Sequence, residues 1–349
     1  MTTLTRILHD EISAAPQGRL TFAQIMQQAL YHPQHGYYGP GPRRIGRSGD
    51  FYTAVSVGPL YGRLLSDLAD QVFEELGQPQ HFAVIEQAAH DGQLAEDILS
   101  QSTFDYVIVE PNPKYEASQR QRLEVFGSRI QWVSSLARLP AIPALFICNE
   151  LPDAMPVHLV TWDGAAWREL YVQTRGDGLA FVSGEPSSER LLTELSRLPT
   201  GLPKGYTTEV NLAALDWMQE LANAPFRGAI YIADYGFDEA ELYAPERTTG
   251  TLRRYKGHQT DDHVLEDLGE SDLTTHVNFS RMIGVAETYG LKLHSYELQG
   301  RFLGKLGLPV IASLEGRVDG TTQALLRQYH SLTHPAFMGR SFRILRLDK

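Results

Sequence analysis

The chain of 349 residues has a single cysteine, no long apolar run and no long run of Lys or Arg. Because Cys148 stands alone, an internal disulfide and a zinc site made of cysteines are both excluded. Its apolar runs, such as residues 143–148, are far shorter than the roughly 20 residues that span a bilayer. A net charge of −11 is unfavourable for gripping nucleic-acid phosphates. We therefore expect neither a membrane nor a nucleic acid as a partner.

The start of the chain also lacks the marks of a targeting segment. Its first residues include Asp10 and Glu11, and they contain neither the apolar block of a secretory signal nor the Arg-rich face of a transit peptide. We therefore expect a cytoplasmic protein. Hydrophobic residues make up 42% of the chain and charged residues 21%, which permits a substantial buried core. At this length, one large core with insertions or a second small domain is expected.

Residues 1–59 are the first predicted domain, a helical extension followed by a loop. Apolar residues at helical spacing predict helices within residues 1–30, and Thr21 is a suitable N-cap for the second of them. The stretch 31–60 is rich in Gly, Pro and Tyr and cannot be one regular element. Long ordered loops of this kind are usually functional.

Residues 60–349 are the second predicted domain, an α/β fold with two insertions. The expected helices are 60–76, 93–100, 113–126, 209–224 and 278–289, and the expected strands are 81–87, 106–110, 144–150, 228–236, 291–299 and 341–348. Short apolar strands that alternate with helices indicate a parallel, doubly wound sheet. Alternating residues on both sides of Asp163-Gly164 predict an inserted β-hairpin. The insertions are expected at about 156–208 and 237–275.

The turn after the first strand, residues 86–94, is the expected place for a nucleotide-like cofactor. A glycine such as Gly92 lets a ligand approach the backbone, and the helix that follows offers free N–H groups. Glu110, at the end of the next strand, is placed to accept hydrogen bonds from both ribose hydroxyls of an adenosine. Trp132, after the third strand, could stack on an adenine or pack in the core.

Polar residues follow two later strands. The sequence Asn149-Glu150-Leu151-Pro152-Asp153-Ala154 ends one strand, and Asp234-Tyr235-Gly236 ends another. Acidic side chains there could hold or deprotonate a substrate. Alternatively, Asn149 and Asp153 cap the next helix and Asp234 starts a turn.

Two further groups of residues could be functional, but each also has a simpler explanation. The histidines and aspartates of one long loop are spaced too irregularly for a metal site, so we expect no metal. They are His258, Asp261, Asp262, His263, Asp272 and His276. Arg43, Arg44 and Arg47 could meet a carboxylate or an acidic partner, or could simply be solvated.

Several motifs become recognisable as a set. The segments ALYHPQHGYYG, IGRSGDFYTAVSVGPLYG, NELPDAMPVH, DYG, GTLRRYKGH and DLTTHVNF occur in this order. Together they resemble the MidA family of methyltransferases, which includes a mitochondrial complex I assembly factor that methylates an arginine. The resemblance runs from about residue 20 to 304. Separate motifs in register are far more specific than a lone glycine-rich turn.

The resemblance implies a class I methyltransferase fold, with a Rossmann-like sheet of seven strands and an antiparallel last strand. It also implies S-adenosylmethionine as cofactor and a nitrogen acceptor, such as arginine, on a protein. The predicted catalytic residues are Glu150, Asp153 and Asp234, which would orient a guanidinium and make its lone pair available. The predicted cofactor-binding residues are Asp50, Tyr52, Thr53, Glu86, Ala88, Gly92, Glu110, Trp132 and Asn149.

The first turn departs from the Glu-x-Gly-x-Gly-x-Gly pattern usual in this family, because Ala88 and His90 replace its first two glycines. A Cβ at Ala88 disfavours positive φ, and the His90 side chain could reach the space of the cofactor's methionine portion. One alternative is therefore a binding or assembly protein of the same fold that has lost turnover. A nicotinamide-dependent oxidoreductase is disfavoured, since residues 87–92 lack the Gly-x-Gly-x-x-Gly fingerprint.

Overall fold

The computed structural model describes residues 2–41, 53–257 and 259–349, and the chain forms two compact units. Unit 1 comprises residues 1–41, 152–217 and 236–282, and unit 2 comprises residues 42–151, 218–235 and 283–349. The chain passes from one unit to the other within three elements, α7 (Leu212–Asn223), β10 (Arg227–Phe237) and α9 (Phe279–Thr288).

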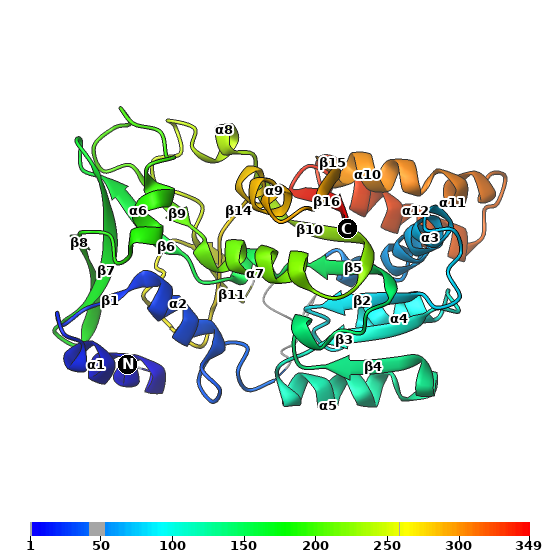
Figure 1. Cartoon of the computed structure of the whole chain (residues 1–349), viewed down its shortest axis with the longest axis horizontal. Helices are drawn as coiled ribbons and strands as arrows, with labels where there is room; N and C mark the ends of the chain where they lie inside the picture. Colours follow the sequence, from blue (N-terminus) through cyan, green and yellow to red (C-terminus); the bar gives the residue numbers. More distant parts are fainter. Residues whose placement is uncertain (1, 42–52, 258) are drawn as a thin grey trace. The chain divides into compact units, whose positions relative to one another are not determined.

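Unit 2 is built on a path of seven strands (Figure 1). In spatial order they are β15 (Lys292–Leu298), β16 (Phe342–Asp348), β10, β5 (Pro143–Asn149), β2 (Ala83–Gln87), β3 (Asp105–Val109) and β4 (Ile130–Val133). The five strands from β10 to β4 are parallel, whereas β16 runs antiparallel to both of its neighbours. The six predicted strands and the antiparallel last strand are therefore confirmed, with ends within two residues of those expected.

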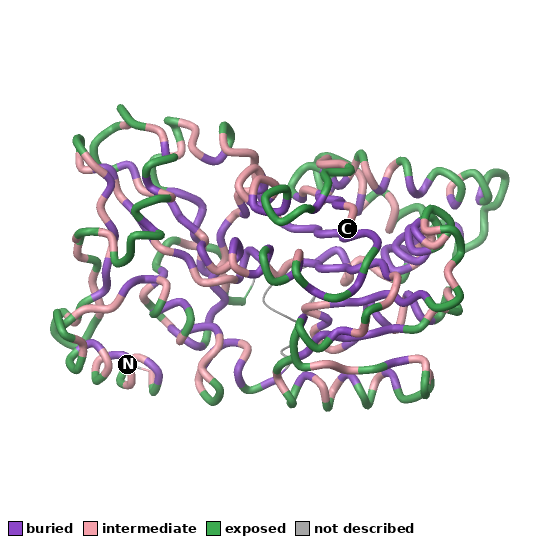
Figure 2. The backbone as a smooth tube through the Cα atoms, viewed as in Figure 1, coloured by how far each residue is buried: buried purple, intermediate pink, exposed green. Residues whose placement is uncertain are grey.

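The helices of unit 2 supply apolar side chains to the core around this sheet. They are α3 (Leu60–Glu75), α4 (Gln93–Leu99), α5 (Pro113–Arg122), α10 (Gln299–Leu306), α11 (Leu308–Ser313) and α12 (Gly320–Thr333). In α3, the buried residues Leu64, Leu65, Leu68 and Val72 recur at helical spacing and form one apolar stripe. The central strands of the sheet are buried along most of their length (Figure 2), as expected for parallel strands covered on both faces.

Unit 1 contains two antiparallel sheets. The larger has the order β1 (Leu20–Thr21), β7 (Trp167–Arg175), β6 (His158–Trp162) and β9 (Thr207–Val210), and β8 (Gly178–Gly184) pairs with β7. The smaller has the order β12 (Gln259–Asp261), β11 (Arg253–Lys256) and β13 (Asp272–Thr274). The predicted hairpin about Asp163-Gly164 is confirmed by the pairing of β6 with β7. The strands β8, β9 and β11 to β13 were not predicted.

The helices of unit 1 include the two expected in the first thirty residues. They are α1 (Thr3–Ala14), α2 (Phe22–Tyr31), α6 (Glu189–Leu195) and α8 (Glu239–Leu242). Thr21 caps α2 as predicted, because its side chain accepts the backbone N–H of Gln24 while the Gln24 side chain accepts the N–H of Thr21. A short strand, β14 (Val277–Asn278), pairs in parallel with the last two residues of β10.

Candidate functional site

The first turn of unit 2 keeps the left-handed backbone that glycines normally supply. The φ angles are +68° at Ala88, +47° at His90 and +87° at Gly92. Residues with a Cβ rarely adopt this region. The two replacements therefore leave the turn in a glycine-like conformation and place backbone strain there instead. At Gly92, a Cβ would approach the Leu123 side chain to 3.2 Å, so this position also favours glycine for reasons of space.

The side chains of the turn are engaged with α5. The His90 ring packs edge-on against the buried Tyr115, with 5.6 Å between ring centroids. Asp91 accepts a hydrogen bond of 2.7 Å from the Arg122 guanidinium. Burial raises the pKa of Asp91, but the hydrogen bonds and charges of His90 and Arg122 outweigh burial and lower it to about 2. The turn is thus tied to one helix by an aromatic contact and an ion pair.

Glu110 is the acidic residue that follows β3, and it is 8% exposed. One carboxylate oxygen accepts the backbone N–H of Asn112 at 2.8 Å, and the other accepts the Gln119 Nε2 at 3.0 Å. A carboxylate offers about four lone-pair positions, so each oxygen can accept one more hydrogen bond. This acceptor set fits the two neighbouring hydroxyls of a ribose. Burial raises the pKa of Glu110, and the hydrogen bonds from Asn112 and Gln119 oppose that rise.

Gln119 was not predicted from the sequence. It is fully buried in α5, and its Nε2 donates to the His90 carbonyl oxygen at 2.8 Å as well as to Glu110. Its Oε1 accepts the indole N–H of Trp132 at 3.0 Å. No sequence signal marks it, because a glutamine in a polar helix is usually solvated.

Trp132 lies inside β4 and not after it, which corrects the expected position. Its side chain is half-buried, and the Arg120 guanidinium lies over its ring at 4.2 Å from the centroid. One face of the indole is therefore covered by an arginine. The indole N–H is committed to Gln119.

Glu86 and Asn149 lie at the ends of the two central strands. Glu86 is buried and accepts the Tyr106 hydroxyl at 2.7 Å. Burial raises its pKa to about 8, although the hydrogen bond from Tyr106 acts in the opposite direction. Asn149 accepts the hydroxyl of Tyr61 at 2.7 Å and donates to the Glu150 carboxylate at 2.9 Å. Tyr61 is fully buried and was not predicted to belong to the site.

Glu150 directly follows β5, and Asp234 lies within the neighbouring strand β10. Asn149 is paired with Ala233 in the β5–β10 register, and the Glu150 N–H donates to the Ala233 carbonyl at 2.9 Å. Glu150 has a φ of +54°, which is a strained value for a residue with a side chain. Asp234 is fully buried within β10, so the alternative that it starts a turn is wrong. The backbones of these two predicted residues therefore lie next to each other across β5 and β10.

Asp153 lies in unit 1, in a short helical turn at Pro152–Ala154. It is buried, and burial together with the charge of Asp272 raises its pKa to about 8. Thr53 is in unit 2 and shares a hydrogen bond of 2.9 Å with Ser56. The predicted residues Asp50 and Tyr52, together with Arg43, Arg44, Arg47 and His258, fall outside the described residues. Across residues 2–41, 53–257 and 259–349, no cluster of His, Cys, Asp or Glu could hold a metal ion.

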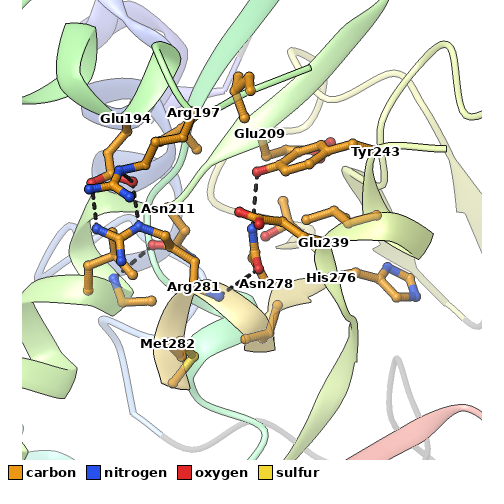
Figure 3. Close-up of a pocket in the computed structure, with 17 residues that line it drawn as sticks. Glu194, Arg197, Glu209, Asn211, Glu239, Tyr243, His276, Asn278, Arg281 and Met282 are labelled. Carbon is orange, nitrogen blue, oxygen red and sulfur yellow. Dashed lines mark hydrogen bonds and ion pairs between the residues drawn. The ribbon is translucent and has the colours of Figure 1, made fainter. Parts of the chain in front are cut away.

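Unit 1 contains a pocket between α6, β9, α7, α8 and the start of α9 (Figure 3). Its Arg281 makes two hydrogen bonds of 2.7 and 2.8 Å to Glu194, and Asn278 donates to the Tyr243 hydroxyl at 3.1 Å. Much of its polar lining is thus paired within the pocket. None of the predicted catalytic or cofactor-binding residues lines it.

The strand order of unit 2, the left-handed first turn and the acid after the second parallel strand define a class I S-adenosylmethionine-dependent methyltransferase. A family model for S-adenosyl-L-methionine-dependent methyltransferases matches residues 64–297, and the chain belongs to this family. The resemblance to the MidA family is confirmed by curated relatives. The mitochondrial protein arginine methyltransferase NDUFAF7 homolog of Drosophila melanogaster is 28% identical over 94% of this chain and 81% of its own length. NDUFAF7 of Xenopus laevis is 28% identical over 93% and 80%.

Solved structures agree with the relatives. A protein from Burkholderia thailandensis bound to S-adenosyl-homocysteine has a TM-score of 0.89 and 27% identity, covering 99% of this chain and 92% of that protein. A native crystal structure from the same organism has a TM-score of 0.87, with 27% identity and coverage of 99% and 91%. The predicted cofactor, S-adenosylmethionine, and the predicted enzyme class are confirmed.

The expected cytoplasmic location is contradicted, because the curated relatives are named as mitochondrial proteins. The acidic residues near the start of the chain were therefore a poor guide to location. In the part of the chain that the structure describes, no helix is long and apolar enough to cross a membrane.

Proposed function

We propose that the chain methylates a guanidinium nitrogen of an arginine side chain in a protein substrate. The observation that supports this best is the pair of acids at neighbouring strand positions, Glu150 and Asp234. A carboxylate is the group that binds a guanidinium through two parallel hydrogen bonds. The relatives named as protein arginine methyltransferases support the same acceptor.

S-adenosylmethionine supplies, when bound, an electrophilic methyl group on a sulfonium and leaves as a neutral thioether. We assign the binding of its ribose hydroxyls to Glu110. We expect the cofactor to lie close to the backbone of residues 88–92. Glu150 orients the guanidinium and accepts the proton that the methylated nitrogen loses. We assign Asp234 to hold the same guanidinium from the adjoining strand. Burial and the charge of Asp272 raise the pKa of Asp153, which disfavours its ionised form, so we assign the proton to Glu150 and not to Asp153.

The experiment is transfer of a tritiated methyl group to peptides that contain one arginine, with matched peptides in which lysine replaces it. We expect label only in the arginine peptides, recovered as methylarginine after acid hydrolysis. Label in the lysine peptides, or on another group, would contradict the proposed acceptor.

The role of Glu150 is tested by Glu150→Gln, which keeps the size of the side chain but cannot accept the proton. We expect transfer to fall by about 100-fold or more, in the range typical of general acid–base catalysis. The affinity for S-adenosyl-homocysteine should stay within about two-fold, because the ribose is assigned to Glu110 and not to Glu150. Glu124→Gln, at an exposed position of unit 2, is the matched control and should retain full activity. Full activity in Glu150→Gln would refute the role.

A further inference from the structure

We propose that Gln119 is a positioning residue of the adenosine site, which fixes the Glu110 carboxylate and the strained first turn relative to each other. The inference rests on the cofactor and not on the identity of the methyl acceptor. Three hydrogen bonds carry it, and all three belong to one buried amide.

The amide of Gln119 has a defined orientation. Its Nε2 has two N–H groups, and these donate to the His90 carbonyl oxygen at 2.8 Å and to the Glu110 carboxylate at 3.0 Å. Its Oε1 accepts the Trp132 N–H at 3.0 Å. If the amide were flipped, Oε1 would face the His90 and Glu110 oxygens, which are both acceptors, and Nε2 would face the Trp132 N–H, which is a donor. Only one orientation of Gln119 satisfies all three partners.

The amide joins segments that follow or lie in three different strands. Glu110 follows β3, His90 is in the turn after β2, and Trp132 is in β4. Gln119 is fully buried, so water does not replace these bonds while the side chain is in place. The side chain therefore connects three neighbouring strand segments from a single position in α5.

The Gln119 hydrogen bond also bears on how Glu110 would bind a ribose. Each Glu110 oxygen already accepts one hydrogen bond, from the Asn112 backbone or from Gln119, and this fixes the plane in which the remaining lone pairs lie. To bind two neighbouring ribose hydroxyls, both Glu110 oxygens must hold their remaining lone pairs in a defined direction. Without the Gln119 donor, one oxygen loses its anchor, and the negative charge of Glu110 is less well stabilised.

The test measures the affinity for S-adenosyl-homocysteine by calorimetry between pH 5 and 9. Gln119→Met removes all three hydrogen bonds at similar size, and Gln119→Leu removes them with a second neutral side chain. Gln121→Met, at an exposed position of the same helix, is the matched control. Glu116 and His90 also interact electrostatically with Glu110, and both residues stay unchanged in every variant.

We expect about 10-fold weaker binding at pH 7 in both Gln119 variants. The acid limb of the affinity should also move to higher pH by at least about half a unit, because Glu110 is then protonated more readily. A residue that only packs would not move this limb. Affinity and pH profile like those of Gln121→Met, in a folded Gln119 variant, would overturn the proposal. If Gln119→Met does not fold, Gln119→Leu decides, because it also removes the three hydrogen bonds and adds no charge beside Glu110.

Discussion

Backbone strain in this chain gathers at the strand ends that form the predicted site. Among the described residues, five other than glycine have positive φ, and Ala88, His90 and Glu150 are three of them. A left-handed conformation costs roughly 1–2 kcal/mol for a residue with a Cβ. Such strain persists only where the surroundings determine the backbone, as the Gln119 and Tyr115 contacts do for His90.

The strain at Ala88 predicts that Ala88→Gly stabilises the protein. Relief of the left-handed conformation outweighs the extra backbone entropy of glycine, so the free energy of unfolding should rise by about 0.5–1 kcal/mol. Urea denaturation measures this change in the free energy of unfolding. Ala89→Gly is the control, because Ala89 is buried next to it and is not among the residues with positive φ. It should lower stability, and an equal loss in both variants would show that Ala88 is not strained.

Helices α3 and α4 approach each other closely at Gly62. A Cβ on Gly62 would lie 2.4 Å from the Asp97 Cβ, so the two helices would have to separate. We expect Gly62→Ala to lower the free energy of unfolding by about 1–3 kcal/mol, as overpacking does elsewhere. The midpoint of urea unfolding measures this loss.

Gly320→Ala is the matched control for this prediction. Gly320 opens α12, and a Cβ there meets no atom within 4 Å. The substitution should be neutral or stabilise by up to about 1 kcal/mol, since alanine favours helix more than glycine does. A Gly62→Ala variant as stable as Gly320→Ala would mean that α3 and α4 can separate without lowering the free energy of unfolding.

The elements of unit 2 could be predicted from the sequence because their apolar residues repeat with a clear period. The predicted helix 93–100 matches α4 and the predicted strand 144–150 matches β5 to within one residue. In α5 the buried residues are Tyr115 and Gln119, so no apolar stripe reveals its inner face. The Gln119 contacts join residues far apart in sequence, and a pattern along one element cannot show them.

The short strands of unit 1 were missed for a different reason. β11, β12 and β13 have only three or four residues each and contain charged side chains such as Arg254 and Asp261. Arg254 donates to Asp261 at 2.6 Å and to Asp267 at 3.0 Å, so ion pairs accompany the backbone pairing there. Such strands have no hydrophobic period to detect. The predicted domain boundary at residue 59 stays a prediction.

Buried acids make the free energy of unfolding of the protein depend on pH. Burial raises the pKa of Glu86 to about 8, and burial with the charge of Asp272 raises that of Asp153 to about 8. In the unfolded chain these groups titrate near about 4. Between about pH 4 and 8, the folded chain therefore binds more protons than the unfolded chain does. Their contribution to stability is present below about pH 4 and is lost as the pH rises toward about 8.

We therefore expect Glu86→Gln to flatten the dependence of the melting temperature on pH between about 5 and 8. Glutamine is neutral throughout and can still accept the Tyr106 hydroxyl, so the variant avoids ionising a buried carboxyl as the pH rises. Relative to the parent, it should gain stability steadily up to about pH 8, by an amount of the order of a few kcal/mol. Asp105→Asn, at an exposed position at the start of β3, is the control. Parallel pH profiles for the parent and Glu86→Gln would show that Glu86 is already ionised in the folded protein at neutral pH.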